Sequence, residues 1–378
     1  MQFFGAVTII ESETPEGGIN MPKTVKTVLK IFGVLIAAVL VLAIVLVGWL
    51  SITEFKPEPV EVVPVSIHGN EKTENPVLGE NIRVLTFNIG YCNLGKESDF
   101  FMDGGENVRN GDEELVLKNL DGVIETIEEA DADILLLQEV DVDSSRSFGI
   151  NEGYIIAEHL GGRNSLARNY NCDFVPFPWP PIGKVDSGIM THTDLNMENG
   201  RRIALPCPFS WPVSAANLKR CLLVNYFDIE GSDKQLAVVN LHLEAYDDGE
   251  GKIAQTKMLW DILTEEYAKG NYVIAGGDFN QMFPGTEEIY PITTAELWEP
   301  GVLEESALPE GWRYVYDDTN PTCRLLNQPY DPASENTQYY VIDGFIVSPN
   351  VELVSVETVD AEFEFSDHNP VVMEVVLK

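Results

Sequence analysis

The chain has 378 residues, a formal net charge of −37 at pH 7, and a hydrophobic fraction of 44%, which is enough to bury the core of one large domain. A surface this acidic repels nucleic acid and anionic lipid head groups unless a local basic cleft or bound divalent cations reverse the field. The five cysteines include no C-x-x-C pair, so their spacing is neither a zinc-site pattern nor a disulfide framework.

Near the N-terminus, residues 31–50 form an uncharged apolar run, IFGVLIAAVLVLAIVLVGWL. A helix of about twenty such residues can cross a hydrocarbon core of about 30 Å. Lysines precede the run and glutamates follow it, so the positive-inside rule places the N-terminus in the cytoplasm. We therefore predict a short cytoplasmic segment over 1–30 and an uncleaved transmembrane anchor over 31–52, with the rest of the chain outside the cytoplasm. A cleaved signal peptide is the alternative, but its apolar region is usually only about 7–15 residues long.

The segment that follows, residues 53–80, holds four prolines among charged residues and is predicted to be an extended linker. Upstream of the anchor, Met21 begins a more ordinary signal-anchor sequence, MPKTVKTVLK, so translation could start at Met1 or at Met21. The sequence leaves this choice open.

Residues 81–378 are predicted to form one large α/β domain. Apolar residues recur at helical spacing over about 114–130, and a second helix is expected over about 252–268. Strand-like apolar runs are predicted at 82–88, 133–140, 186–191, 220–229, 235–243, 271–276, 340–347 and 370–377. Many strands with few helices favour two packed sheets with helices outside them.

Several of these strands end in carboxylates, amides or histidines, which indicates a site at one edge of the sheets. In IAGGDFN (274–280), Asp278 and Asn280 lie two apart and share one face of an extended chain. In SDHNP (366–370), Asp367 and His368 directly precede a strand. Each motif taken alone is also compatible with an ordinary turn.

Two carboxylates lie inside apolar strands, where a charge is costly unless it is paired or hydrogen-bonded. Asp343 interrupts YVIDGFIVS and would be satisfied by a histidine partner, whereas Glu139 in LLLQEV would be satisfied by a divalent cation. His242 in NLHLEAY also lies mid-strand. Because oxygen ligands predominate, the set favours Mg²⁺ or Mn²⁺.

The ordered set Asn88, Gln138–Glu139, His242, GDFN, Asp343 and SDHNP resembles the endonuclease/exonuclease/phosphatase superfamily, and in particular a deoxyribonuclease- or sphingomyelinase-like, membrane-anchored bacterial member. The resemblance covers about residues 82–378. It implies a four-layer α/β sandwich, in which two packed mixed sheets are flanked by helices. It also implies hydrolysis of phosphoesters with Mg²⁺ or Mn²⁺.

The resemblance assigns roles residue by residue. The expected metal ligands are Asn88, Glu139 and Asp367. Asp278 and Asn280 are expected to orient or deprotonate the attacking water and to hold the phosphate. Asp343 is expected to fix the ring of His368, which contacts the phosphoryl group, and His242 is expected near the leaving group or phosphate.

Three cations in this cation-poor chain, Arg201, Arg202 and Arg220, are candidates for binding the substrate phosphate. The acidic, glycine-rich segment 93–113 and the aromatic stretch PFPWPP (176–181) are expected either to shape the substrate mouth or to be plain surface loops. The sequence shows no aromatic hairpin obviously suited to insertion into a bilayer.

Three functions are compatible with these features. The first is a phosphodiesterase or phosphatase that acts on a small or lipid-borne phosphoester at the outer face of the cell membrane. The second is an extracellular nuclease, which the acidic charge disfavours without excluding it. The third, a catalytically silent binding module, is opposed by the complete set of polar residues. The protein is expected to be a monomer held in the membrane by its single N-terminal helix.

Overall fold

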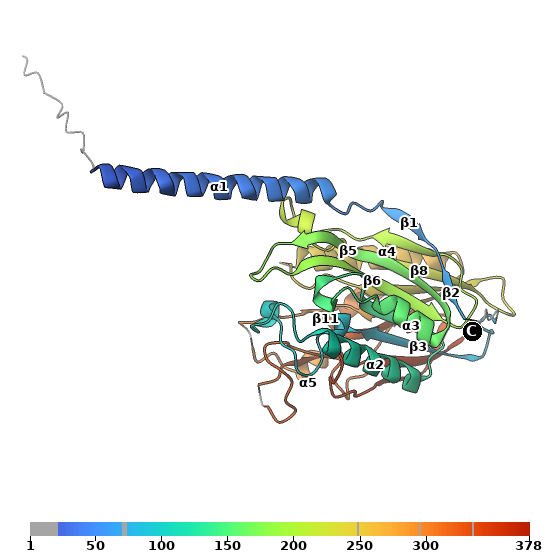
Figure 1. Cartoon of the computed structure of the whole chain (residues 1–378). Coiled ribbons are helices and arrows are strands. Elements are labelled where there is room, and N and C mark those ends of the chain that lie inside the picture. The colour runs from blue at the N-terminus through green and yellow to red at the C-terminus, as the bar shows by residue number, and fades with distance from the viewer. Residues whose placement is uncertain (1–21, 70–73, 248, 295, 335) are drawn as a thin grey trace, which may run out of the picture. The chain divides into compact units, whose positions relative to one another are not determined.

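The computed structural model describes residues 22–69, 74–247, 249–294, 296–334 and 336–378 (Figure 1). The chain divides into two compact units, residues 1–49 and residues 50–378. The first 21 residues of the predicted cytoplasmic segment, and with them the choice between Met1 and Met21, lie outside the described residues.

The first unit consists of most of helix α1 (Lys23–Thr53), whose last turn belongs to the second unit. Among the described residues, α1 alone is long and apolar enough to cross a membrane, and none of its apolar stretch is buried in protein. A helix that is apolar on every face and exposed to water would be unfavourable, because its side chains would gain nothing from folding. The helix covers the predicted anchor, residues 31–52, and begins eight residues before it.

The second unit contains two seven-stranded mixed sheets in its described part. One sheet has, in spatial order, β1 (Val60–Val63), β7 (Gly200–Ala204), β8 (Cys221–Asp228), β9 (Gln235–His242), β10 (Tyr272–Asp278), β16 (Asp343–Val347) and β13 (Arg313–Val315). The other has β17 (Val351–Thr358), β18 (Val371–Leu377), β3 (Asn81–Asn88), β4 (Ile134–Asp141), β6 (Gly183–Thr193), β5 (Gly162–Val175) and β2 (Ser66–His68).

Shorter elements connect these strands. Two-stranded sheets are formed by β11 (Gln281–Met282) with β12 (Gly301–Val302) and by β14 (Cys323–Arg324) with β15 (Tyr339–Tyr340). The remaining α-helices are α2 (Glu113–Ala130), α3 (Glu152–Leu160), α4 (Glu250–Ala268) and α5 (Thr286–Ile289). Single 3₁₀ turns are η1 (Gly90–Cys92), η2 (Phe101–Asp103), η3 (Ser145–Ser147), η4 (Val213–Ala216) and η5 (Glu305–Ala307).

The two sheets pack face to face through a core that includes Val84 and Ile134 of one sheet and Val238 and Ile274 of the other. Because side chains alternate along a strand, Leu85 and Leu135 point away from this core, toward the outer helices. Each fully buried aliphatic side chain stabilises the fold by about 1.5–3 kcal/mol.

Helices cover the outer face of each sheet (Figure 1). The apolar side of α2, with Leu120 and Val123, lies against β3 and β4, and α4 lies against β9 and β10. Asp112 caps α2 by accepting a hydrogen bond from the backbone N–H of Leu115. Helix, sheet, sheet and helix give four layers, which confirms the predicted α/β sandwich.

The predicted linker, residues 53–80, is in part integrated into the sheets. Val60–Val63 form β1, which pairs with β7, and Ser66–His68 form β2, which pairs with β5. The alternating sequence VEVV suits an edge strand, and the prolines on either side of it do not interrupt its hydrogen bonds. The segment predicted as an extended linker therefore contributes an edge strand to each sheet.

Candidate active site

The expected catalytic residues meet because four strands from two sheets end at the same edge. In one sheet, Asp278 at the end of β10 lies opposite both His242 of parallel β9 and Asp343 of antiparallel β16. In the other sheet, Asn88 ends β3 beside Gln138 of parallel β4. A hydrogen bond of 3.0 Å from Asn88 Nδ2 to Asp278 Oδ2 joins the two sheets at this edge.

The backbone at this edge adopts conformations that few residues tolerate. Gly277 has φ +153°, and a Cβ atom there would lie 1.9 Å from the carbonyl oxygen of Leu241. Asn280, the last residue of the same motif, has φ 50°. Glu139 has φ 56° and lies at a register shift between β4 and β6. Such left-handed non-glycine residues are typical of functional sites, since the surrounding fold must hold them in place.

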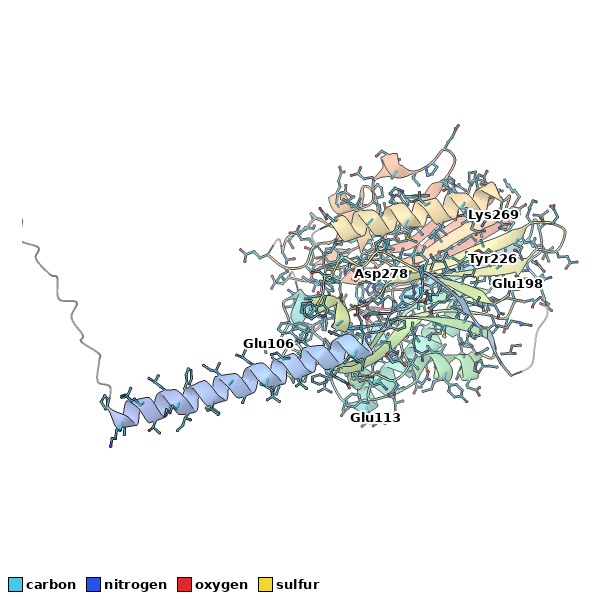
Figure 2. The ribbon with its side chains drawn as sticks, turned by 90° about the horizontal axis from the view of Figure 1, so that it is seen from above. Glu106, Glu113, Glu198, Tyr226, Lys269 and Asp278 are labelled. Atoms are coloured by element: carbon cyan, nitrogen blue, oxygen red, sulfur yellow. The ribbon has the colours of Figure 1, made fainter. Side chains whose placement is uncertain are left out.

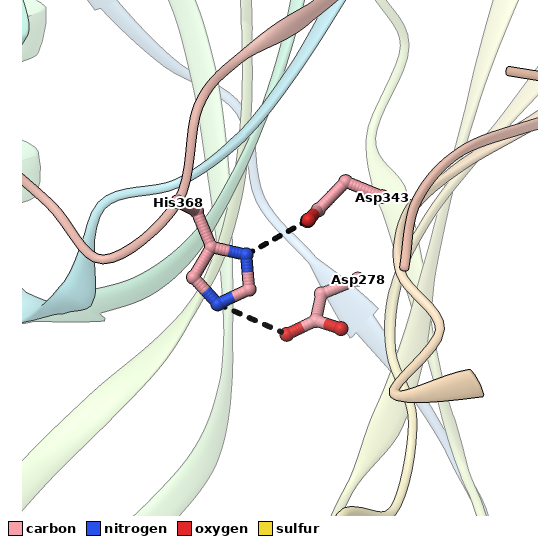
Figure 3. Close-up of side chains that lie close together, drawn as sticks. All are labelled: Asp278, Asp343 and His368. Carbon is pink, nitrogen blue, oxygen red and sulfur yellow. Dashed lines mark hydrogen bonds and ion pairs between the residues drawn. The ribbon is translucent and has the colours of Figure 1, made fainter. Parts of the chain in front are cut away.

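Asp343 and His368 form a buried pair, with Oδ2 of Asp343 2.8 Å from Nδ1 of His368 (Figure 3). Burial alone would lower the pKa of His368, but the negative charge of Asp343 outweighs burial and raises that pKa well above its ordinary value. This shift favours the charged imidazolium form of the ring. Its Nε2 lies 3.9 Å from Oδ2 of Asp278 and 3.9 Å from Oδ2 of Asp367.

Asp278 lies at the centre of the cluster. Its Oδ1 accepts a hydrogen bond of 2.8 Å from the backbone N–H of Asn280, and its Oδ2 lies 3.5 Å from Nε2 of His242. Burial, together with the neighbouring charge of Asp343, raises the pKa of Asp278 to about 6. Burial also lowers the pKa of His242 well below its ordinary value, so this second ring is neutral.

Glu139 and Asp367 supply further negative charge. The side chain of Glu139 is about 25% exposed, which makes it the most exposed carboxylate of the cluster. Burial raises the pKa of Glu139, and Arg146 opposes this shift. Burial and the charge of Glu139 raise the pKa of Asp367 to about 7. Burial is the main cause of both shifts, and the charge of a neighbouring carboxylate adds to each of them.

These clustered carboxyl groups are oxygen donors of the kind that a divalent cation prefers. Oxygens of Glu139 and Asp367 face the cluster, whereas Oδ1 of Asn88 accepts a hydrogen bond from the backbone N–H of Gly90 and its Nδ2 faces the carboxylates. Asn88 would thus ligate a cation only if its amide turned over. Asp278, Asp343 and His368 also lie close enough together to hold an ion, but His368 Nδ1 is already bonded to Asp343.

One other predicted residue, Asn280, lies beside the cluster in a supporting position. Asn280 donates a hydrogen bond of 2.9 Å from Nδ2 to the carbonyl of Leu243. This contact fixes the turn that follows Asp278, the last residue of β10.

The three candidate arginines are not brought together at the cluster. Arg201 donates a hydrogen bond to the hydroxyl of Tyr226, which Figure 2 shows well separated from Asp278. Arg202 is buried and donates to the carbonyls of Arg168 and Lys219. Their proposed contact with substrate stays an untested prediction.

Arg220 is closer to the site, but it lies beneath it. Its Nε lies 3.3 Å from Oε2 of Glu244, and its Nη1 donates a hydrogen bond of 3.2 Å to the carbonyl of His242. Both side chains of this ion pair are about 4% exposed. Arg220 therefore holds the end of β9 in position.

Sequence reasoning missed two groups that border the cluster. Asp103 Oδ1 accepts a hydrogen bond of 3.0 Å from the hydroxyl of Tyr246, and burial raises the pKa of Asp103 to about 6. Arg146 forms a bidentate ion pair with Asp141 and lies 3.7 Å above the ring of Tyr91. The only sequence signal for the first group was the position of segment 93–113 directly after a catalytic strand.

Comparisons with known proteins agree with this geometry. Residues 85–368 match the sequence model of the Endonuclease/Exonuclease/phosphatase family. The chain belongs to this family, which makes it a phosphoester hydrolase. A search of curated proteins finds no match.

Solved structures with the same fold include an endonuclease/exonuclease/phosphatase from Beutenbergia cavernae DSM 12333. That structure has 18% identity and a TM-score of 0.56, over 79% of this chain and 72% of the other. Another, from Bacteroides vulgatus, has 18% identity and a TM-score of 0.50, over 79% of this chain and 100% of the other. At this identity the likeness concerns the fold alone.

Proposed function

We propose that the protein is a divalent-metal-dependent hydrolase that cleaves a small or lipid-borne phosphoester at the outer face of the cell membrane. The observation that carries this proposal is the meeting of Asp278, Asp343 and His368 with Glu139 and Asp367 at one sheet edge. An imidazolium, a carboxylate with a raised pKa and clustered carboxylates able to hold a cation are the groups that phosphoester hydrolysis needs.

His368 is suited to bind the phosphoryl group. Asp343 holds Nδ1 and keeps the ring charged, so the proton on Nε2 is available for a phosphoryl oxygen. This charge-assisted hydrogen bond strengthens as negative charge develops in the transition state.

Asp278 is suited to orient the attacking water and to take its proton. Its pKa of about 6 leaves the carboxylate ionised at neutral pH but more basic than an ordinary aspartate. Hydrogen bonds from Asn88 and from the backbone of Asn280 fix both of its oxygens. His242, neutral and 3.5 Å away, is placed to form a hydrogen bond with the leaving oxygen.

Glu139 and Asp367, with Asn88 if its amide turns over, would hold Mg²⁺ or Mn²⁺. When bound, the cation would draw negative charge from the phosphoryl oxygens. It would also stabilise the ionised form of both carboxyl groups against the burial and the neighbouring negative charge that raise their pKa.

The proposal is tested by a hydrolysis panel with the full-length protein in detergent, in Mg²⁺, in Mn²⁺ and in EDTA. The substrates are bis-p-nitrophenyl phosphate, p-nitrophenyl phosphate, plasmid DNA, sphingomyelin and inositol phosphates. We expect turnover that requires the metal and that His368→Ala abolishes, while His159→Ala, which removes an exposed histidine on α3, leaves it unchanged. No turnover by a folded protein on any substrate would contradict the proposal.

The panel also separates the nuclease alternative from the preferred function. A nuclease should prefer plasmid DNA and should lose affinity steeply as salt rises, because counterions are released on binding. Preference for a small ester or for sphingomyelin, with little dependence on salt, would support the preferred function.

The proposed topology rests on the apolar helix α1 and on the lysines that precede it. Cys207 offers a direct test, because it is exposed whereas the other four cysteines are buried. In intact protoplasts, a membrane-impermeant maleimide should label the wild type but not Cys207→Ser. Labelling that appears only after lysis would place the domain in the cytoplasm.

A further inference from the structure

We propose that two uncharged loops rest in the interfacial layer of the membrane that α1 crosses, so that the active site opens toward lipid and takes a lipid-borne phosphoester. The contact is made by Phe177 and Trp179, between β5 and β6, and by Trp211 and Val213, in or beside η4. We call these four residues the aromatic rim. This inference rests on the proposed hydrolase function and membrane anchor.

The rim side chains are unusually exposed for their size. Trp179 is 89% exposed, Phe177 72%, Trp211 64% and Val213 57%. An aromatic side chain can remove about 150–250 Å² from water, so leaving three of them exposed is costly unless a partner covers them.

Both loops also lack charge in a strongly acidic chain. Residues 174–183 and 203–218 contain no Asp, Glu, Lys or Arg, although 22% of the whole chain is charged. Prolines at 176, 178, 180 and 181 restrict the first loop, so its aromatic side chains lose little backbone entropy on binding. Rigid, uncharged and aromatic loops suit the membrane interface, where indole rings partition well.

The chain enters the folded domain beside the second loop. Oγ of Ser51, the residue after the apolar run, accepts a hydrogen bond of 2.8 Å from Nε1 of Trp211. Three residues later, Glu54 pairs with Lys219 at 2.8 Å. No free linker separates these contacts from the end of the apolar run, so Trp211 must lie close to the point where the chain leaves the bilayer.

The first loop lies on the same side of the domain as the active-site opening. The ring of Phe177 packs edge to face against Phe101, with centroids 6.2 Å apart, and Phe101 lies in the segment that follows the first catalytic strand. Two residues on, Asp103 binds the hydroxyl of Tyr246, which follows the strand of His242.

The second loop reaches the site through other contacts. Gln255 of α4 donates to the carbonyl of Pro206 and accepts from the backbone N–H of Glu244, next to the strand end that carries His242. Each loop is thus linked to residues beside the catalytic cluster through intervening side chains. A bilayer in contact with the rim would lie on the side of the cluster where we place the partly exposed Glu139.

Charge favours lipid over a macromolecular partner. The net charge of −37 repels nucleic acid and acidic proteins, and it also repels anionic head groups. A zwitterionic lipid surface can contact the aromatic rim without being repelled by the negative charge of the protein, so we take it as the partner of the rim. Because the helix already supplies a high local concentration, the rim needs only to orient the domain.

The contact is tested with the full chain reconstituted in phosphatidylcholine vesicles, with or without brominated acyl chains, which quench nearby tryptophans. The emission of Trp179 is taken as the difference between wild type and Trp179→Phe. We expect brominated lipid to reduce this difference by at least about twofold, since indoles settle at the acyl boundary. The same measurement on Trp312→Phe, a buried tryptophan, should show no reduction. Equal emission of Trp179 in both vesicles would overturn the proposal.

Activity gives a second, separate readout. The double variant Phe177→Ala/Trp179→Ala should hydrolyse a diacylglyceryl p-nitrophenyl phosphodiester in the vesicles about tenfold more slowly, because the domain is no longer held against the lipid. Its rate on soluble bis-p-nitrophenyl phosphate should stay within about twofold of wild type. Tyr154→Ala, which removes an exposed aromatic ring beside β2 at the other end of β5, should change neither rate.

These outcomes distinguish the two proposals. Equal rates of variant and wild type on the lipid ester, or equal losses on both esters, would contradict the proposal that the rim holds the domain against the membrane. If wild type hydrolyses neither ester in Mg²⁺ or Mn²⁺, the proposed hydrolase function fails, and the quenching of Trp179 still decides whether the rim meets lipid.

Discussion

Nδ1 of His368 and Oδ2 of Asp343 lie 2.8 Å apart, and they join the two sheets of the domain at the active-site edge. Asp343 begins β16 of one sheet, and His368 comes shortly before β18 of the other. The backbone N–H of Asp343 donates to the hydroxyl of Thr322, while its Oδ1 has no hydrogen-bond partner in the described part of the chain. The imidazolium therefore provides the main compensation for a buried carboxylate.

Replacing Asp343 by Asn should change the pH dependence of the reaction as well as its rate. Without the carboxylate, the pKa of His368 should fall toward its ordinary value of about 6.5, because burial lowers it and only smaller contributions, such as the charge of Asp367, still raise it. We expect the rate to fall by about 10²–10⁴-fold at pH 8 and to recover in part as the pH falls. The measurement is a pH–rate profile between pH 5 and 9 on bis-p-nitrophenyl phosphate. A uniform loss at every pH would mean that Asp343 only supports the fold.

Replacing Asp278 by Asn should stabilise the metal-free protein at neutral pH. The folded-state pKa of about 6 exceeds the ordinary value of 3.8, so Asp278 favours folding fully only below about pH 4, and this contribution is lost as pH rises toward 6. The difference corresponds to about 3 kcal/mol. In EDTA, the gap in unfolding free energy between variant and wild type should grow from pH 4 to pH 6 and then level off. A gap independent of pH would contradict this account.

Most members of the cluster could be predicted from the sequence, because each is a polar residue inside or at the end of an apolar strand. A carboxylate inside an apolar strand, as at Asp343 and Glu139, is unfavourable without a partner, and the partner must therefore be elsewhere in the fold. The helices α2 and α4 and most of the predicted strands also followed from apolar periodicity.

Other elements could not be predicted in this way. Strand β5 reads GRNSLARNYNCDFV, with polar residues on both faces, so no apolar alternation marks it. The sequence also does not show where an arginine side chain points. Arg202 and Arg220 are buried against carbonyls and a carboxylate that only the folded chain brings beside them. The exposure of Trp179 also depends on how the β5–β6 loop projects from the sheet.

Gly277→Ala should disrupt the site through the backbone. A Cβ atom at φ +153° would collide with the carbonyl of Leu241, on the strand that carries His242. We expect a loss of at least about 3 kcal/mol in unfolding free energy, because both the strained φ and the clash must be relieved. Chemical denaturation in detergent measures this loss. Gly301→Ala is the control, since the nearest atom to its Cβ would be 3.2 Å away in a flexible side chain, and it should change stability by less than about 1 kcal/mol.

Arg220→Met should destabilise the domain by removing the partner of a buried carboxylate. Glu244 is about 4% exposed, and its Oε1 also accepts from the backbone N–H groups of Ala245 and Tyr246. A buried charge left without its partner costs about 3–5 kcal/mol. Arg201→Met, which removes a hydrogen bond to Tyr226, should cost about 1 kcal/mol and serves as the control.

The double variant Arg220→Met/Glu244→Gln separates the charge from the packing. The Gln oxygen can keep both backbone hydrogen bonds without a buried charge, so the double variant should be more stable than Arg220→Met alone by about 1 kcal/mol or more. Its kcat should nevertheless stay below that of wild type, because the carbonyl of His242 has lost the hydrogen bond from Arg220 in both variants. Equal stability of the single and double variants would show that the charge pair does not stabilise the fold. A wild-type kcat in the double variant would show that Arg220 does not position His242.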